Sequence, residues 1–424
     1  MTRATKDSGF EWIGEIPTSW ELYKGKYMFT QRNLRGNTIE LQLLSPTQKY
    51  GVVPQSVYED RSGMNAVKLN ENANLSALKT IHKGDFCISL RSFQGGFEYS
   101  EYEGVVSPAY QVFYPVVKVA REYYKYLFKD SGFIEKMNSY TMTLRDGKNI
   151  AFADFGNTYI PCPPIDEQYR IANFLDAKCA EIDALTADIQ TQIDTLEQYK
   201  RSVITETVTK GLNPDAETKD SGIEWVGRIP AHWPIHPVYF YYGERKNKNR
   251  LGKEDNLLSL SYGRVIRKDI NTNDGLLPES FNTYNIVEAG DIIIRPTDLQ
   301  NDKRSLRTGL VKEHGIITSA YIDLCPLKQV DSRYFHFLLH AYDVMKVFYN
   351  MGNGVRQGLN YSEFSRLMVF EPPYEEQVAM ADYLETKVTE VDAIIEQKKE
   401  QMAVLNAYKR SLIFEYVTGK KEVI

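Results

Sequence analysis

Apolar residues recur every three, four or seven positions along two segments of the chain, which is the spacing of one face of a helix. The first segment follows Pro163-Pro164 and ends near Thr209, just before Gly211. The second follows Pro372-Pro373 and ends before Gly419. Each predicts a helix of roughly 40 residues, about 60 Å long.

A single apolar stripe on a helix of that length needs a partner, so we expect the two helices to pack against each other. Polar residues such as Gln192 and Lys398 interrupt a strict heptad, which predicts an imperfect seam with surface left for another protein. The residues expected to pair the helices are Ile182, Leu185, Ile189, Leu196, Tyr199, Val391, Ile394, Leu405, Tyr408 and Leu412.

The rest of the chain predicts mixed domains. Short β-like runs at 86–90, 110–114 and 291–294 alternate with loops rich in Gly, Asn and Asp, and helical patches follow at 122–128 and 332–347. The predicted fold class is therefore α+β: two α/β domains with mostly antiparallel strands, separated by the two long helices. The predicted segments are a first domain at 1–160, a helix at 161–213, a second domain at 214–370 and a helix at 371–424.

The chain is a tandem duplication. Residues 6–20, KDSGFEWIGEIPTSW, return as residues 219–233, KDSGIEWVGRIPAHW, with ten of fifteen positions identical. Pro-Pro-x-x-Glu-Gln occurs at 163–168 and again at 372–377, and Tyr-Lys-Arg-Ser occurs at 199–202 and 408–411. Weaker echoes such as Gly84-Asp85 and Gly290-Asp291 lie between these motifs. Two repeats of this length are too few for a solenoid, so the pattern indicates a pseudo-twofold molecule.

Composition narrows the class of protein. The 424 residues are 42% hydrophobic and 25% charged, and no apolar run approaches the roughly 20 residues that cross a bilayer. The four cysteines form no CxxC pair, which fits a reducing compartment, so we expect a cytoplasmic protein. The formal charge of −5 argues against an autonomous nucleic-acid binder. The negative charge falls on the two helical segments, however, whereas both mixed domains are slightly positive.

The motifs that suggest catalysis each lack a residue that the chemistry needs. Glu371-Pro372-Pro373-Tyr374 is close to the loop with which amino-methyltransferases hold a target adenine, but Glu371 stands where a shorter Asn or Asp is needed. His336 and His340 have zinc-protease spacing, but Phe337 takes the place of the general base. No phosphate-binding loop is present. We expect no catalytic, cofactor or metal site in this chain.

Binding signals are more numerous. Arg, Lys, Asn and Gln cluster in both mixed domains, and these side chains bind base edges and phosphates. The candidate DNA-binding residues are Arg32, Arg35, Arg91, Gln94, Arg145, Lys148, Asn149, Lys246, Lys248, Arg250, Arg264, Arg267, Lys268, Arg295, Arg304, Arg307, Arg356 and Gln357.

The doubled Gly-[Phe/Ile]-Glu-Trp-[Ile/Val]-Gly-x-Ile-Pro-x-x-Trp motif, with the doubled Pro-Pro-x-x-Glu-Gln helix, strongly resembles the specificity subunit of type I restriction–modification enzymes. The resemblance covers essentially the whole chain. It implies two target recognition domains, each reading one half of a split DNA sequence, and two helices that pair as an antiparallel coiled coil.

The resemblance also implies partners. The helices would dock modification (methyltransferase) subunits, two in number, and restriction (helicase-nuclease) subunits would join them. S-adenosylmethionine, ATP and Mg would belong to those partners. Because the two domains differ in sequence, we expect an asymmetric bipartite target in double-stranded DNA, and the length of the helices would set the spacing between its halves.

Two alternatives remain open from the sequence. One is an adenine-N6 DNA methyltransferase that uses the Glu371-Pro372-Pro373-Tyr374 loop. The other is a scaffold or decoy that binds modification subunits but no DNA. We also expect the isolated chain to bind DNA weakly, because phosphate contacts supply most non-specific affinity and neither domain is strongly basic.

Overall fold

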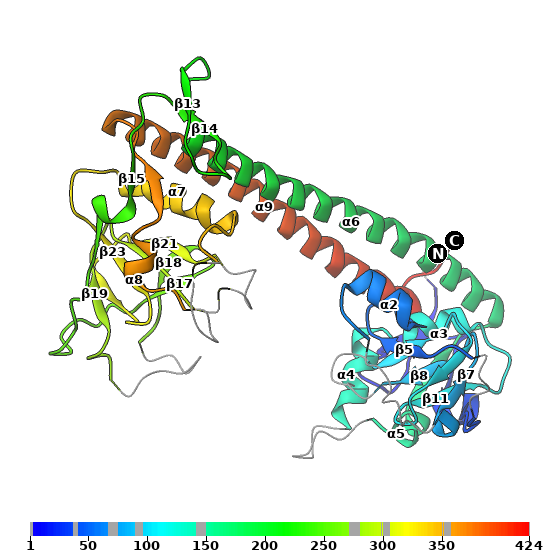
Figure 1. The fold of residues 1–424 in the computed structure, drawn as a ribbon. Helices are drawn as coiled ribbons and strands as arrows, with labels where there is room; N and C mark the ends of the chain where they lie inside the picture. The colour runs from blue at the N-terminus through cyan, green and yellow to red at the C-terminus, as the bar shows by residue number, and fades with distance from the viewer. Residues whose placement is uncertain are drawn as a thin grey trace. The chain divides into compact units, whose positions relative to one another are not determined.

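The computed structural model describes residues 3–36, 41–66, 75–89, 96–140, 150–270, 280–297, 299, 306–349, 351 and 358–423. Candidate residues Arg91, Gln94, Arg145, Lys148, Asn149, Arg304, Arg356 and Gln357 lie outside this description. The chain divides into two compact units (Figure 1): unit 1 is Met1–Ile189 with Lys399–Ile424, and unit 2 is Gln190–Lys398.

Unit 1 is built around a four-stranded antiparallel sheet in the order β4-β11-β8-β9. Its strands are β1 (Thr5–Asp7), β2 (Glu15–Pro17), β3 (Glu21–Lys24), β4 (Phe29–Gln31), β5 (Leu44–Thr47), β6 (Gly51–Pro54), β7 (Lys79–Ile81), β8 (Phe86–Ile88), β9 (Phe97–Tyr99), β10 (Gly104–Val106), β11 (Gln111–Pro115) and β12 (Tyr159–Cys162). Its short helices are α1 (Gly25–Met28), α2 (Gln55–Ser62), the 3-10 turn η1 (Leu75–Ala77), α3 (Arg121–Leu127), α4 (Ser131–Ser139) and α5 (Phe152–Asn157).

Unit 2 repeats this plan around the sheet β16-β23-β20-β21. Its strands are β13 (Thr218–Asp220), β14 (Arg228–Pro230), β15 (Ile235–Pro237), β16 (Tyr242–Glu244), β17 (Leu258–Ser261), β18 (Arg264–Arg267), β19 (Asn285–Val287), β20 (Ile292–Ile294), β21 (Thr308–Leu310), β22 (Gly315–Ile317), β23 (Ile322–Pro326) and β24 (Met368–Phe370). Its short helices are the 3-10 turn η3 (Val238–Phe240), α7 (Ser332–Val344) and α8 (Tyr361–Phe364).

The two-stranded pairs are duplicated as well. β1-β2, β3-β12, β5-β6 and β7-β10 of unit 1 correspond to β13-β14, β15-β24, β17-β18 and β19-β22 of unit 2, and every one of these pairs is antiparallel. Residues at the same place in this duplicated order are called equivalent below. The predicted α+β fold with two mixed, mostly antiparallel domains is confirmed.

The long helices α6 (Ile165–Lys210) and α9 (Tyr374–Val417) match the two predicted helical segments. Both begin after a Pro-Pro pair with acidic residues in the first turn, which favours the positive end of the helix dipole. Both end before a glycine in the left-handed region, Gly211 at φ +75° and Gly419 at φ +74°. Each helix begins in one unit and ends in the other.

The doubled motif residues hold these helices to the sheets. Trp20 is buried, and its Nε1 donates to Glu167 Oε2 at 3.0 Å. Trp233 does the same with Glu376, again at 3.0 Å. The tryptophan of the first motif and the glutamate of the second therefore have a structural role in both repeats.

The following residue of each motif, a buried glutamine, completes the joint. Gln168 donates to the Pro163 carbonyl and accepts from the Ala120 amide. Gln377 donates to the Pro372 carbonyl at 2.8 Å and accepts from the Asp331 amide at 2.9 Å. The side chain thus pairs two buried backbone groups, which connects the start of each long helix to the start of a short helix, α3 in unit 1 and α7 in unit 2.

Candidate nucleic-acid interface

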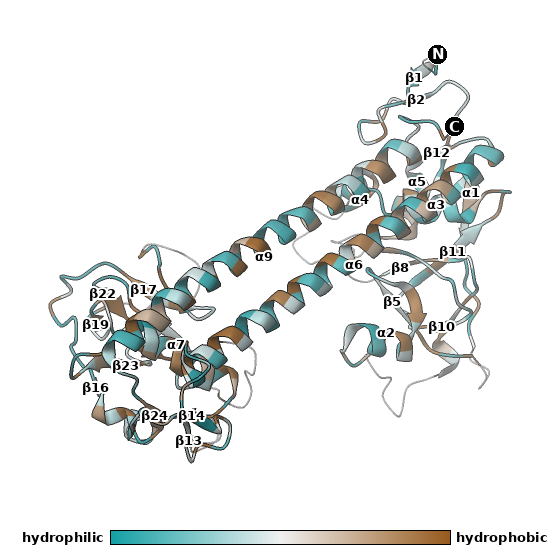
Figure 2. Cartoon of the chain, turned by 90° about the horizontal axis from the view of Figure 1, so that it is seen from above, coloured by the Kyte–Doolittle hydropathy of each residue, from teal (hydrophilic) through white to brown (hydrophobic). Residues whose placement is uncertain are grey.

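The two long helices run antiparallel within each unit. In unit 1, Lys409 Nζ lies 2.6 Å and 2.7 Å from the two carboxylate oxygens of Asp183. In unit 2, Lys200 Nζ donates to Asp392 Oδ1 at 2.7 Å. In unit 1 the ring of Phe174 also lies against that of Tyr416, and in unit 2 Lys398 also donates to Gln192, so residue numbers rise along α6 as they fall along α9 in each unit. Figure 2 shows apolar residues distributed along both helices. Asp183 and Asp392 are equivalent, as are Lys409 and Lys200, so the ion pair is duplicated.

The predicted pairing residues are only partly enclosed. Ile182, Val391 and Leu412 are buried, and Leu405 packs against the same apolar cluster as Ile182 and Leu412. Ile189 and Leu196 are half-buried.

Four predicted pairing residues keep large exposed fractions and lie at the margin of the apolar stripe: Leu185 (53%), Tyr199 (50%), Ile394 (43%) and Tyr408 (54%). They form two equivalent pairs, Leu185 with Ile394 and Tyr199 with Tyr408. The periodicity placed them on the apolar stripe, but two helices enclose only the centre of such a stripe. Its margins face outward.

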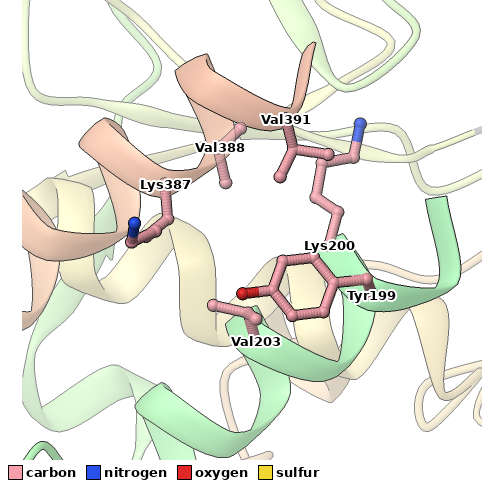
Figure 3. A pocket seen from close by; sticks show the side chains of 6 residues that line it. All are labelled: Tyr199, Lys200, Val203, Lys387, Val388 and Val391. Carbon is pink, nitrogen blue, oxygen red and sulfur yellow. The ribbon is translucent and has the colours of Figure 1, made fainter. Parts of the chain in front are cut away.

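An apolar hollow lies between the helices in unit 2 (Figure 3). Tyr199, Lys200 and Val203 line it from α6, and Lys387, Val388 and Val391 line it from α9. The half-exposed ring of Tyr199 makes one wall.

Arg32 is tied into the fold of unit 1. Its Nε donates to Asp85 Oδ2 at 2.6 Å and its Nη2 to Oδ1 at 3.2 Å, and the guanidinium lies 4.2 Å from the centre of the Tyr114 ring. Arg245 of unit 2 is equivalent and makes the same two bonds to Asp291, at 2.7 Å and 3.1 Å. In each unit this arginine therefore links the end of one main-sheet strand, β4 or β16, to the turn before another, β8 or β20.

Arg307 was predicted to bind DNA, and the structure shows that this prediction is wrong. The side chain is fully buried, its Nε donates to the Tyr349 hydroxyl at 2.9 Å, and its Nη1 donates to the Thr297 carbonyl. Its backbone amide donates to the buried carboxylate of Asp343. A guanidinium enclosed in this way does not reach a duplex, so Arg307 stabilises the interior of unit 2.

The remaining described candidates lie at or near the surface. In unit 1, Arg35 is exposed, and after burial it is the second cause of the lowered pKa of Lys79. In unit 2, Arg295 is half-buried and Lys268 is exposed. Arg267 makes a bidentate pair with Glu313, and Arg264 pairs with Asp392 at 2.5 Å.

A basic loop at 245–254 gathers the other candidates of unit 2. Lys246 is 71% exposed beside Glu244, Lys248 donates to the Thr283 carbonyl, and Arg250 is exposed. The loop is shaped from inside by Asn249, which is 3% exposed and exchanges two hydrogen bonds with the backbone of Glu254. Because one buried amide fixes the turn, the cationic side chains are presented from an ordered loop.

The rejected catalytic motifs have ordinary structural roles. The Glu371 amide donates to the Pro234 carbonyl, and the two prolines lead into α9. His336 and His340 lie in α7, where burial lowers the pKa of His336 to about 3 and that of His340 to about 4. Among the described residues no group of three or more His, Cys, Asp or Glu side chains is arranged to hold a metal ion. No described helix combines the length and apolar character that crossing a bilayer requires.

Residues 18–195 match the family model of the type I restriction modification DNA specificity domain. Two curated proteins of Methanocaldococcus jannaschii are similar to the chain. The putative type I restriction enzyme MjaX specificity subunit is 25% identical over 270 residues, which is 62% of this chain and 59% of that protein. The type I restriction enzyme MjaVIII specificity subunit is 25% identical over 291 residues, 63% of each. The matched region thus spans less than two thirds of either relative.

Two solved structures share the fold. A chain from a study of complex assembly and conformational transition of the type I R-M system has a TM-score of 0.71 and 14% identity, covering 96% of this chain and 99% of that one. The HsdS subunit from Thermoanaerobacter tengcongensis has a TM-score of 0.50 and 14% identity, covering 96% and 98%. At this identity the likeness concerns the fold alone.

Proposed function

We propose that this chain, whose residues 18–195 match the type I restriction modification DNA specificity domain, is the DNA-reading subunit of a type I restriction–modification complex. The resemblance predicted from the sequence agrees with that match over residues 18–195. In this proposal the chain selects the DNA sequence and carries out no chemistry itself.

The observation that carries the proposal is the duplication of the matched domain. The family match falls on the first repeat, and unit 2 repeats its sheet order, its strand pairs and its Trp–Glu joint. A chain with two such domains of different sequence reads two different half-sites. The target is therefore an asymmetric, bipartite sequence in double-stranded DNA.

The described cations of unit 2 suit this role. Lys246 and Arg250 project from the ordered loop that Asn249 shapes, and arginine and lysine bind guanine edges and phosphates. In unit 1, Arg35 follows β4 as the basic loop of unit 2 follows β16. We assign these loops to contact with DNA.

The helices supply the surface for partners. Leu185, Tyr199, Ile394 and Tyr408 are half-exposed apolar side chains at equivalent places, and an identical subunit bound twice would meet the same surface twice. We propose two modification subunits as these partners, with restriction subunits joining them in the cytoplasm. S-adenosylmethionine, ATP and Mg would be bound by the partners.

Methylome sequencing of cells with and without this gene tests the proposal. We expect one bipartite methylated motif to disappear when the gene is deleted and to return when it is restored. Replacing the segment 214–370 with that of another specificity subunit should change one half of the motif and leave the other half unchanged. An unaltered methylome after deletion would contradict the proposed function.

A further inference from the structure

The β17-β18 hairpin of unit 2 ends in a two-residue loop with an unusual first residue. Ser261 pairs with Arg264, so Tyr262 and Gly263 form the loop. Both residues have positive φ, +47° and +77°, as a type I′ turn requires. Asn, Asp and Gly are the residues that favour this conformation, whereas an aromatic residue is strained in it. The backbone therefore gives no reason for a tyrosine at this position.

Packing gives no reason either. The Tyr262 side chain is 89% exposed, the largest value among the large apolar side chains in the part of the chain that the structure describes. An aromatic ring that costs backbone strain and contributes almost nothing to the core is expected to act on something outside the molecule.

The hairpin beneath the ring is held at three places. At its base, Arg267 and Glu313 form a bidentate pair. At its middle, Leu260 and Val265 lie over Gly309, where a Cβ on the glycine would meet Val265 Cγ2 at 3.1 Å.

The third anchor is at the tip. Arg264 Nη2 lies 2.5 Å from Asp392 Oδ2, while Lys200 binds the other oxygen of the same carboxylate at 2.7 Å. The ring is thus presented by an anchored hairpin.

The equivalent hairpin and the equivalent helix carboxylate make different contacts in unit 1. Asp183, which is equivalent to Asp392, gives both carboxylate oxygens to Lys409. The equivalent hairpin β5-β6 closes through three residues, 48–50, because Thr47 pairs with Gly51. There the Tyr50 hydroxyl donates to the Arg61 carbonyl, and the Arg61 guanidinium lies 5.8 Å from the ring centre. An outward, strained aromatic residue anchored through the long helices is thus a feature of unit 2.

The surroundings of Tyr262 indicate the chemistry of its ligand. Arg264, Arg267 and Lys268 follow it on β18 and just beyond; all three are exposed, and Arg264 and Arg267 are paired with Asp392 and Glu313. A planar ring beside exposed guanidinium and ammonium groups fits an anionic polymer with stacked planar groups.

We propose that Tyr262 is a DNA-contacting residue whose ring packs into a groove of the duplex at the half-site read by unit 2. Arg264 and Asp392 are positioning residues that hold the hairpin for this contact. The inference rests on the proposed function.

The test uses the complex of the full chain with its modification subunits and a duplex that carries the methylated motif. Fluorescence anisotropy measures the Kd of the wild type and of Tyr262→Asn, Tyr262→Phe and Tyr239→Asn. We expect Tyr262→Asn to bind about tenfold more weakly, by analogy with the loss of one base–aromatic contact. Tyr262→Phe should retain most of the affinity. Tyr239 is 55% exposed elsewhere in unit 2, so Tyr239→Asn should bind as the wild type does.

Two further measurements separate contact from structure. Because Asn favours a type I′ turn, the melting temperature of Tyr262→Asn should equal or exceed that of the wild type; a lower one would assign Tyr262 to the fold and overturn the inference. On a duplex with a scrambled second half-site, Tyr262→Asn and the wild type should bind equally. A tenfold difference there would also overturn it.

The matched control for the anchor is the pair Asp392→Asn and Asp183→Asn. Each removes one helix–helix ion pair, but only the first also frees the hairpin. We expect about threefold weaker binding for Asp392→Asn alone, as befits a partly exposed ion pair. Equal losses for both variants would remove the assignment of Asp392 as a positioning residue. If the wild-type complex binds no DNA, the proposed function fails; if it binds and Tyr262→Asn binds equally well, only this inference fails.

Discussion

Asp323 is a buried carboxyl group at the centre of the main sheet of unit 2. Both of its oxygens lack a hydrogen-bond partner, and Arg245 Nε is 4.0 Å away while it binds Asp291. Burial, followed by the charge of Asp291, raises the pKa of Asp323 to about 8. The equivalent residue in unit 1 is Val112, which packs in an apolar cluster. The same strand position thus carries an apolar residue in one unit and an ionisable one in the other.

The raised pKa of Asp323 predicts that the stability of the chain depends on pH. Between about pH 4 and pH 8 folded Asp323 retains a proton that the unfolded chain has lost, so the free energy of unfolding falls as pH rises through that range. Above pH 8 the carboxyl group of folded Asp323 is ionised, and the full free-energy cost of burying its charge is present. Asp323→Val should stabilise the chain by about 1–3 kcal/mol at pH 8 and have a smaller effect at pH 5.

Urea unfolding of both proteins at the two pH values is the measurement. The reciprocal variant Val112→Asp is the control and should destabilise the chain most at pH 8. An equal effect of Asp323→Val at both pH values would show that the carboxyl group is not protonated in the folded state.

At the residue scale, the sequence reveals the basic clusters but not which of their members lie on an accessible surface. Arg32 and Arg307 were expected on a binding surface, whereas the structure pairs Arg32 with Asp85 and buries Arg307 against Tyr349. Their partners lie 53 and 42 positions away in the sequence. Local spacing contains no information about such a partner. Tyr262 was missed for a related reason, since only the backbone angle reveals that it stands where Asn or Gly is expected.

At the scale of elements, the contacts of the Pro-Pro-x-x-Glu-Gln motif explain why the motif occurs twice. Its glutamine is buried and satisfies a proline carbonyl and an amide at the start of a short helix, α3 in unit 1 and α7 in unit 2. Its glutamate holds the tryptophan of the other duplicated motif. The joint therefore needs these side chains whatever sequence the surrounding loops carry.

Gln377→Leu should destabilise the chain by about 3 kcal/mol, because it leaves two buried backbone groups without partners. Gln397→Leu, at an exposed position of the same helix, should change stability by less than about 0.5 kcal/mol. Chemical denaturation of the two variants gives the comparison. A loss below about 1 kcal/mol for Gln377→Leu would mean that water replaces the side chain.

The long helices were the elements best predicted, since a 3.6-residue period over forty positions has few competing explanations. The burial of their stripe was predicted less well. Periodicity identifies a face, but the width that becomes covered depends on how many elements pack on it. Here Tyr199 and Tyr408 remain half-exposed on the margin.

At the scale of the whole molecule, α6 and α9 both pass from one unit to the other. The ion pairs Asp183–Lys409 and Lys200–Asp392 fix their register at either side of the middle. A seven-residue insertion in α6 alone, between Thr186 and Gln198, would break that register. A matched pair of insertions, the second in α9 between Ala393 and Leu405, preserves it.

The double insertion should change the spacing between the two methylated half-sites and leave both half-site sequences unchanged. Each heptad adds about 10 Å, or about three base pairs. Methylome sequencing of the variant reads the spacing directly. A changed half-site sequence, or an unchanged spacing, would show that the helices do not set the distance.

The sequence by itself determined the duplication, the two long helices and the mixed domains, because these depend on local period and on motifs that recur unchanged. Only the tertiary structure decided which charged side chains are available to a ligand. Arg32, Arg307 and Arg264 read alike in the sequence, yet one is tied to Asp85, one is buried, and one anchors a hairpin tip. The physical reason is that the availability of a charge depends on neighbours brought together from distant parts of the chain.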